Sequence, residues 1–221
     1  MNSEPRAELA ALMEAEHRGS APREAHVLAE EIRRRHGASV DAVLFYGSCL
    51  RRDYVEGGVL DFYAVVDSYR GAYGAGLLAL SNALLPPNTY YVELPFEGGT
   101  LRMKYNVVST ADFSHACRPE SLHSIIWARF CQPAVVLHAR DESVRARLGV
   151  DAAEAAVTMV SRMLALHPVD RQRMDRPDLG DAAEAQFLRF LIPGNLALVQ
   201  FLEGRVNDSL DDLVGLDVHL I

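Results

Sequence analysis

Two short segments carry the residue types that could hold a phosphate group beside a metal ion. Gly47 and Ser48 close one apolar run, and Asp61 stands near the start of the next, at residues 59–67. Glycine lets the backbone approach phosphate oxygens, and a serine hydroxyl donates hydrogen bonds to them. Because a charged side chain is rarely buried without a partner, Asp61 in an apolar strand favours a magnesium ion as that partner. Arg51 and Arg52 follow, where they could meet the outer phosphates.

The strand of Asp61 lacks a second acid. Nucleotidyltransferases of the polymerase-beta-like superfamily usually carry two acids in a D-x-D pattern, because alternate strand residues face the same side. Tyr63 occupies the second position here. Asp67 has the right parity, but six strand residues separate it from Asp61 by about 20 Å, which favours a strand-end turn or a helix cap. We therefore predict Glu93, on an expected strand at 89–95, as the further metal ligand.

Lys104 is the only lysine in the chain, and every other long basic side chain is arginine. It lies in an expected strand at 101–110. A compact ammonium aimed at phosphate would explain its retention, while a solvated residue on a half-exposed strand is the alternative.

Several segments, taken in order, resemble one known family. They are Leu60-Asp61-Phe62, Val65-Val66-Asp67, Lys104-Tyr105, Val107-Val108-Ser109 and Arg129-Phe130-Cys131-Gln132-Pro133. The set is similar to the hallmark segments of the mitochondrial-type phosphatidate cytidylyltransferases, the translocator assembly and maintenance family of the polymerase-beta-like nucleotidyltransferase superfamily. It covers roughly residues 40–140.

The resemblance implies transfer of a cytidylyl group from CTP to phosphatidic acid, giving CDP-diacylglycerol and pyrophosphate, with Mg2+ as cofactor. Carried over by position, Gly47 and Ser48 would cradle the triphosphate, Asp61 would bind metal and Lys104 would contact phosphate. The other nucleotide-binding residues would be Arg51, Arg52, Tyr105 and Arg129. Cys49 and Gln132 stand where the family has glycine and lysine, differences that could alter nucleotide or acceptor choice.

A chemical argument makes a single acid sufficient. The phosphate of phosphatidic acid has a second pKa of about 6, by analogy with phosphorylated side chains, and is already anionic near neutrality. No strong general base is needed to ionise it. Catalysis then depends on holding two anions in line and neutralising their repulsion.

The surrounding pattern predicts an α+β fold, with a nucleotidyltransferase-type mixed sheet flanked by helices and a C-terminal helical extension. Helices are expected at 5–18, 23–36, 73–85 and 119–130, with another starting at Thr110. Strands are expected at 40–46, 89–95 and 134–138, with a hairpin turn at 97–99. We predict a catalytic unit at 1–140 and a mainly helical unit at 141–221.

The amino-acid composition limits the classes of partner and the cellular compartment that we expect for this chain. The net charge of −8 and a pI of about 5.5 argue against a nucleic-acid partner held by general basicity. Three cysteines without C-x-x-C spacing fit a reducing cytoplasm, and no apolar run approaches the roughly 20 residues of a membrane span. We expect a cytoplasmic protein with peripheral contact at the inner face of the membrane.

Two alternatives stay open at this point. One is a nucleotidyltransferase with another acceptor, such as a small-molecule phosphate, an alcohol or a protein hydroxyl. The other is a catalytically silent nucleotide-binding or interaction module, which the missing second acid would permit.

Overall fold

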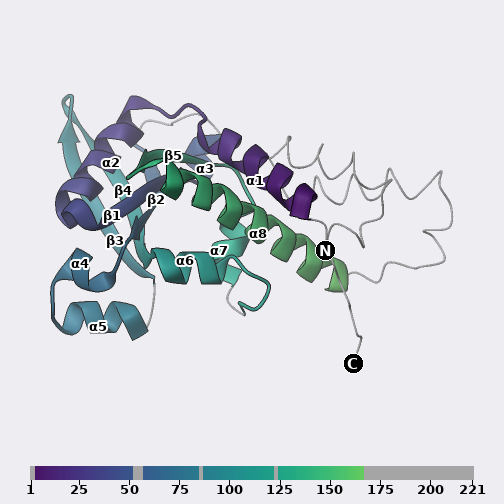
Figure 1. Cartoon of the computed structure of the whole chain (residues 1–221). Helices are drawn as coiled ribbons and strands as arrows, with labels where there is room; N and C mark the ends of the chain where they lie inside the picture. The colour runs from purple at the N-terminus through teal and green to yellow at the C-terminus, as the bar shows by residue number, and fades with distance from the viewer. Residues whose placement is uncertain (1–2, 52–56, 85–86, 122–123, 167–221) are drawn as a thin grey trace, which may run out of the picture.

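In the computed structural model, a five-stranded mixed sheet carries helices on both faces (Figure 1). The structure describes residues 3–51, 57–84, 87–121 and 124–166. The strands are β1 (Val40–Tyr46), β2 (Val59–Val66), β3 (Asn88–Phe96), β4 (Gly99–Ser109) and β5 (Ala134–Ala139). The helices are α1 (Ser3–His17), α2 (Arg23–His36), the 3-10 turn η1 (Gly37–Ser39), α3 (Ser48–Arg51), α4 (Tyr69–Tyr73), α5 (Leu77–Leu84), α6 (Thr110–Ala116), α7 (Ser124–Phe130) and α8 (Glu142–Leu166).

The strand order β3-β4-β2-β1-β5 places β2 at the centre of the sheet. β2 and β4 run parallel, while the other neighbouring pairs run antiparallel. A parallel neighbour requires a crossover connection, and here the chain passes through α4, α5 and β3 before β4 returns beside β2. This crossover aligns residue 61 with residue 104.

Alternate strand residues enter two different cores. Leu60 and Phe62 of β2 pack in the cluster that contains Leu28 and Ile32 of α2. Tyr63, one residue out of phase, packs instead in the cluster formed with α6, α7 and α8. Because strand side chains alternate, Asp61 belongs to the same face as Tyr63. The α7 face of the sheet is therefore the one that carries Asp61.

The sequence predictions of α+β class and of a mixed sheet flanked by helices are confirmed. β1 and α2 have the predicted bounds, and the predicted hairpin turn is present, with positive φ angles of 49° at Glu97 and 82° at Gly98. The helix predicted at 73–85 is wrong in extent. Gly74, with φ of 73°, ends α4, and α5 begins at Leu77.

Asp67 lies just beyond β2, at the predicted strand end. Its carboxylate lies 3.5 Å from the guanidinium of Arg140. The neighbouring Ser68, and not Asp67, is the cap of α4, because its hydroxyl accepts a hydrogen bond from the backbone N–H of Gly71 at 3.1 Å. Asp67 therefore has a structural role away from Asp61.

The predicted helical unit at 141–221 begins with α8, and the first part of this helix packs on the sheet. Val144 and Leu148 of α8 share a core cluster with Leu44 and Tyr63. Residues 167–221, with the further helices expected there, lie outside the described residues, so the division at 140 and 141 stays a prediction. Among the described helices, none is long and apolar enough to cross a membrane.

Candidate functional site

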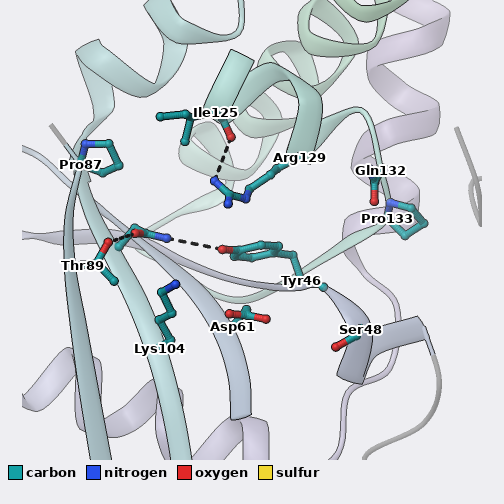
Figure 2. Close-up of a pocket in the computed structure, with 12 residues that line it drawn as sticks. Tyr46, Ser48, Asp61, Pro87, Thr89, Lys104, Ile125, Arg129, Gln132 and Pro133 are labelled. Atoms are coloured by element: carbon teal, nitrogen blue, oxygen red, sulfur yellow. Dashed lines mark hydrogen bonds between the residues drawn. The ribbon is translucent and has the colours of Figure 1, made fainter. Parts of the chain in front are cut away.

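A cleft of about 560 Å³ opens between the sheet and α7. It brings together the end of β1, the start of β2, the middle of β4, the beginning of β3 and the residues that follow α7 (Figure 2). Its lining residues are Tyr46, Gly47, Ser48, Asp61, Pro87, Thr89, Lys104, Asn106, Ile125, Arg129, Gln132 and Pro133. Five of the residues predicted from the sequence are therefore in one place: Gly47, Ser48, Asp61, Lys104 and Arg129.

Gly47 ends β1 in a conformation that only glycine adopts easily. Its φ is 94°, and a Cβ atom built there would lie 3.0 Å from Oδ2 of Asp61. Tyr46 is the register partner of Asp61 across β1 and β2, which explains the close approach. A side chain at position 47 would occupy the space beside the carboxylate. Ser48 follows immediately, with its side chain exposed at the cleft.

Asp61 and Lys104 are direct register partners on the parallel strands β2 and β4. Burial raises the pKa of Asp61 above its usual range, and the charges of Lys104 and Arg129 oppose that rise. Lys104 is exposed toward the cleft. In Figure 2 the Tyr46 ring lies between Arg129 on one side and Asp61 and Lys104 on the other, and all four residues line the cleft. One carboxylate and two cations thus line the same cleft.

A polar network that joins the exposed Thr89 to the buried Asn106 and Tyr46 forms one wall of the cleft. The Thr89 hydroxyl donates to Oδ1 of Asn106 at 2.6 Å, and Nδ2 of Asn106 donates to the Tyr46 hydroxyl at 3.4 Å (Figure 2). Asn106 is only 6% exposed. Because Thr89 occupies the amide oxygen, the orientation of the Asn106 side chain is defined.

Arg129 is held over this wall from α7. Its Nη1 atom donates to the hydroxyl of Tyr63 at 3.4 Å and to the carbonyl of Ile125 at 3.2 Å. Its guanidinium carbon lies 5.9 Å from the centre of the Tyr46 ring, in cation–π range. Tyr63, which stands in place of the second acid, is fully buried beneath Arg129 and packs on Phe130. The side chain at position 63 therefore supports the guanidinium of Arg129.

The sequence analysis missed Tyr46, Thr89 and Asn106. Parity would have found Asn106, because it follows Lys104 by two strand residues and must share its face. Tyr46 directly precedes Gly47, but as an aromatic residue in an apolar run it gave no sign of lining a cleft. Thr89 becomes part of the site only through the register of β3 with β4, which pairs it with Asn106.

Against the prediction that Tyr105 binds nucleotide, the structure places its side chain away from the cleft. Tyr105 follows Lys104 by one residue, so it points to the opposite face of β4. There it is 1% exposed, stacks on Tyr90 and lies 3.2 Å from Nε2 of His36. It is a core residue of the α2 face.

The structure does not bring Glu93 to Asp61. The register partner of Lys104 on β3 is Tyr91. Glu93 lies two residues further along β3, on the same face, and pairs with Arg102. The Glu93 carboxylate is exposed, accepts a hydrogen bond from the Tyr91 hydroxyl at 2.8 Å and forms an ion pair with Arg102 at 3.1 Å. The register of the β3–β4 hairpin, which the sequence did not specify, thus corrects the prediction of Glu93 as a metal ligand.

Arg51 and Arg52 are only partly placed. Arg51 is the last residue of α3, directly after the Gly47-Ser48 turn, but its side chain is outside the described part of the structure. Arg52 lies in the segment 52–56, which the structure does not describe.

The residues present fit a magnesium ion that is shared with a bound phosphate. Within the described residues, no group of three or more His, Cys, Asp or Glu side chains could hold a metal by itself. Mg2+, however, is commonly bound by one or two carboxylates together with substrate phosphates and water. Asp61 is such a carboxylate, and the space that a Cβ atom at position 47 would fill is open beside its Oδ2 atom.

The comparisons with known proteins add no relative. The chain matches no protein-family model and no curated protein. The likeness to the phosphatidate cytidylyltransferases therefore depends on the segments named in the sequence analysis.

Proposed function

We propose that the chain is a magnesium-dependent nucleotidyltransferase that transfers a cytidylyl group from CTP to phosphatidic acid. The observation that carries the proposal is the contact of Gly47 with Asp61, beside which Lys104 stands in register on β4. A glycine turn, a half-buried carboxylate and a cation around one cleft are suited to a nucleoside triphosphate. The choice of CTP and phosphatidic acid is supported by the family resemblance of the segments between residues 40 and 140.

The chemical step needs little from the protein beyond position and charge. An oxygen of the phosphatidate phosphate attacks the α-phosphorus of CTP. The new P–O bond forms as the bond between that phosphorus and the oxygen leading to the β-phosphate breaks, and this oxygen leaves with pyrophosphate. The attacking oxygen is already ionised near neutral pH, so no proton has to be removed.

Each residue of the cleft has its own role in this step. The Gly47 turn and the Ser48 hydroxyl bind phosphate oxygens, while Lys104 and Arg129 neutralise the repulsion between the two anions. Asp61 would hold magnesium, which supplies charge neutralisation on the triphosphate when it is bound. Arg129 is positioned by Tyr63, whose hydroxyl accepts its hydrogen bond.

The proposed acceptor is a membrane lipid, so we place the reaction at the inner face of the membrane, with the chain in peripheral contact from the cytoplasm.

Asn106 and Tyr46 lie deeper in the cleft wall and offer polar atoms to the part of the nucleotide beyond the phosphates.

The decisive experiment is pyrophosphate release by the purified protein with magnesium and each nucleoside triphosphate in turn, with and without phosphatidic acid in detergent micelles. We expect release only when CTP and phosphatidic acid are both present, and loss of release when EDTA removes the metal. Release that needs a different acceptor would assign the site to another nucleotidyl transfer. Nucleotide binding without release under any pairing would favour a silent module, which the single carboxylate of the described cleft allows.

A further inference from the structure

The polar network of Thr89, Asn106 and Tyr46 has a direction. The Thr89 hydroxyl donates to Oδ1 of Asn106, and Nδ2 of Asn106 donates to the Tyr46 hydroxyl. An amide nitrogen carries two protons, and a tyrosine hydroxyl that accepts a hydrogen bond still has its own proton to donate. Within the described residues, neither the second Nδ2 proton nor the Tyr46 proton has a partner. The network therefore offers two neighbouring donors to a molecule in the cleft.

The network lies next to the proposed phosphate site. Asn106 follows Lys104 by two residues on the same face of β4, a displacement of about 7 Å along the strand. In Figure 2 Asp61 and Lys104 lie below the line from Thr89 to Tyr46. Since a ribose separates a nucleobase from its phosphates, a nucleotide with its phosphates at Lys104 can place its base at this network.

Two apolar side chains stand on the other side of the network. Pro87 directly precedes β3, Ile125 of α7 is 48% exposed, and both line the cleft. In Figure 2 they lie above the line from Thr89 to Tyr46, opposite to Asp61. The faces of a nucleobase are apolar and its edge is polar. A base can therefore contact these apolar side chains with a face while its edge meets the network.

We propose that the polar network selects cytosine over uracil in the bound nucleotide. The inference rests on the proposed function, because it takes the ligand of the cleft to be a nucleoside triphosphate. Cytosine has two adjacent acceptors, N3 and O2, whereas N3 of uracil carries a proton and is a donor. O2 lies beside the bond to ribose and meets Tyr46, which directly precedes the Gly47 turn. N3 lies further from the ribose and meets Nδ2 of Asn106, where uracil would bring two donors together.

Thr89 is a positioning residue in this arrangement. An amide side chain presents its nitrogen or its oxygen to a ligand according to its hydrogen bonds, because half a turn exchanges the two atoms. The Thr89 hydroxyl donates to Oδ1 of Asn106, which leaves Nδ2 toward Tyr46 and the base. Thr89 itself is exposed near the start of β3, so its replacement does not open the core.

The test is the affinity of the full chain for CTP and for UTP, measured by calorimetry with magnesium and without an acceptor. We expect the wild type to bind CTP at least about tenfold more tightly than UTP, because a mispaired donor weakens the complex with uracil. Thr89→Val keeps the shape of the side chain without the hydroxyl, and it should bring the two affinities within about threefold of each other. Thr89→Ser keeps the hydroxyl and should keep the preference. Tyr91→Phe is the matched control, since it removes a hydroxyl two residues along β3, outside the cleft, and should bind like the wild type.

A second variant keeps the inference open to contradiction if Thr89→Val fails to fold. O2 is an acceptor in both bases, so Tyr46→Phe should weaken the binding of CTP and of UTP alike, by about threefold to tenfold, and leave their ratio in place. A preference for CTP that Tyr46→Phe abolishes would move the selection to Tyr46 and overturn the role of Asn106.

Three further results would overturn the inference. They are equal affinities of the wild type for the two nucleotides, tighter binding of UTP, which the opposite orientation of the Asn106 amide would produce, and a preference for CTP that Thr89→Val leaves unchanged. Binding of neither nucleotide would overturn the proposed function as well.

The same variants separate the base site from the transfer reaction. Preference for CTP that depends on Thr89, without pyrophosphate release, would support the base site while the proposed function fails. Release with CTP and phosphatidic acid that keeps its preference for CTP in Thr89→Val would support the proposed function and overturn the base site.

Discussion

The Cβ atom that any residue other than glycine would place at position 47 falls 3.0 Å from Oδ2 of Asp61. This contact joins the end of β1 to the start of β2, two segments that are adjacent in the sheet through the pair Tyr46 and Asp61. The turn and the carboxylate are therefore one unit, and a change in either must affect the other.

Gly47→Ala should disable the site more than it destabilises the fold. The positive φ of 94° costs an L-residue about 1–2 kcal/mol, and the added methyl group presses on the Asp61 carboxylate. We expect at least about a tenfold loss of pyrophosphate release. Gly98→Ala is the control, since it has a φ of 82° with nothing within 4 Å of its Cβ position. It should lose similar stability in thermal unfolding and keep its activity; equal losses of activity would contradict the argument.

Asp61→Asn should abolish pyrophosphate release, with a loss of more than about a hundredfold, because an amide would not hold the magnesium ion that we propose for this site. Glu93→Gln makes the same chemical change on an exposed carboxylate outside the cleft and should retain nearly full activity. Tyr63→Phe removes one long hydrogen bond to Arg129 and should cost less than about tenfold. Initial rates at saturating magnesium measure all three. Comparable losses in the Asp61 and Glu93 variants would restore Glu93 as a metal ligand.

Asp61→Asn should also raise thermal stability at neutral pH. Burial raises the pKa of Asp61 in the folded chain above its ordinary 3.8, so the folded state binds more protons than the unfolded state between these two values. Stability therefore falls as pH rises through this window, and the cost remains at pH 7. We expect the variant to have the higher Tm at pH 7 and the difference to shrink as pH falls toward 3.8. A lower Tm for the variant at pH 7 would show that the carboxylate stabilises the fold.

Lys104→Gln should lower the rate of pyrophosphate release by about a hundredfold, because the cation beside Asp61 is lost where two anions must meet. Arg102→Gln, two residues away on the same face of β4, removes a cation that forms an ion pair with Glu93. It should stay within about threefold of the wild type, since exposed ion pairs contribute little. Because Lys104 is the only lysine, an amine-reactive reagent should label it together with the α-amine of the chain, and in the peptide that contains Lys104 the labelling should be reduced by CTP with magnesium. Labelling that CTP leaves unchanged would remove Lys104 from the site.

Tyr105→Phe should keep full activity, because the Tyr105 side chain lies on the α2 face of the sheet. Its hydroxyl lies 3.2 Å from Nε2 of His36, and the loss of this hydrogen bond should cost about 1 kcal/mol in the free energy of unfolding. Denaturant unfolding and the pyrophosphate assay separate the two effects. A large loss of activity with unchanged stability would return Tyr105 to the nucleotide site.

Much of the local structure could be predicted because it depends on neighbours in sequence. The bounds of β1 and α2 follow from an apolar run and from apolar residues three and four positions apart. The turn at Glu97 and Gly98 follows from glycine between two strands. Alternation along β4 also separates Lys104 from Tyr105, so parity alone could have excluded Tyr105.

The sequence by itself determined the chemical groups of the site: the Gly47-Ser48 turn, an acid in a buried strand and a single lysine. Only the tertiary structure decided which of them meet. Lys104 stands beside Asp61 because the crossover makes β4 a parallel neighbour of β2. Glu93 does not stand there, because the register of the β3–β4 hairpin pairs it with Arg102, two residues from Lys104. Arg129 reaches the cleft because α7 packs across the sheet. Such pairings arise from packing between segments far apart in the chain, and neither propensity nor spacing within one segment specifies them.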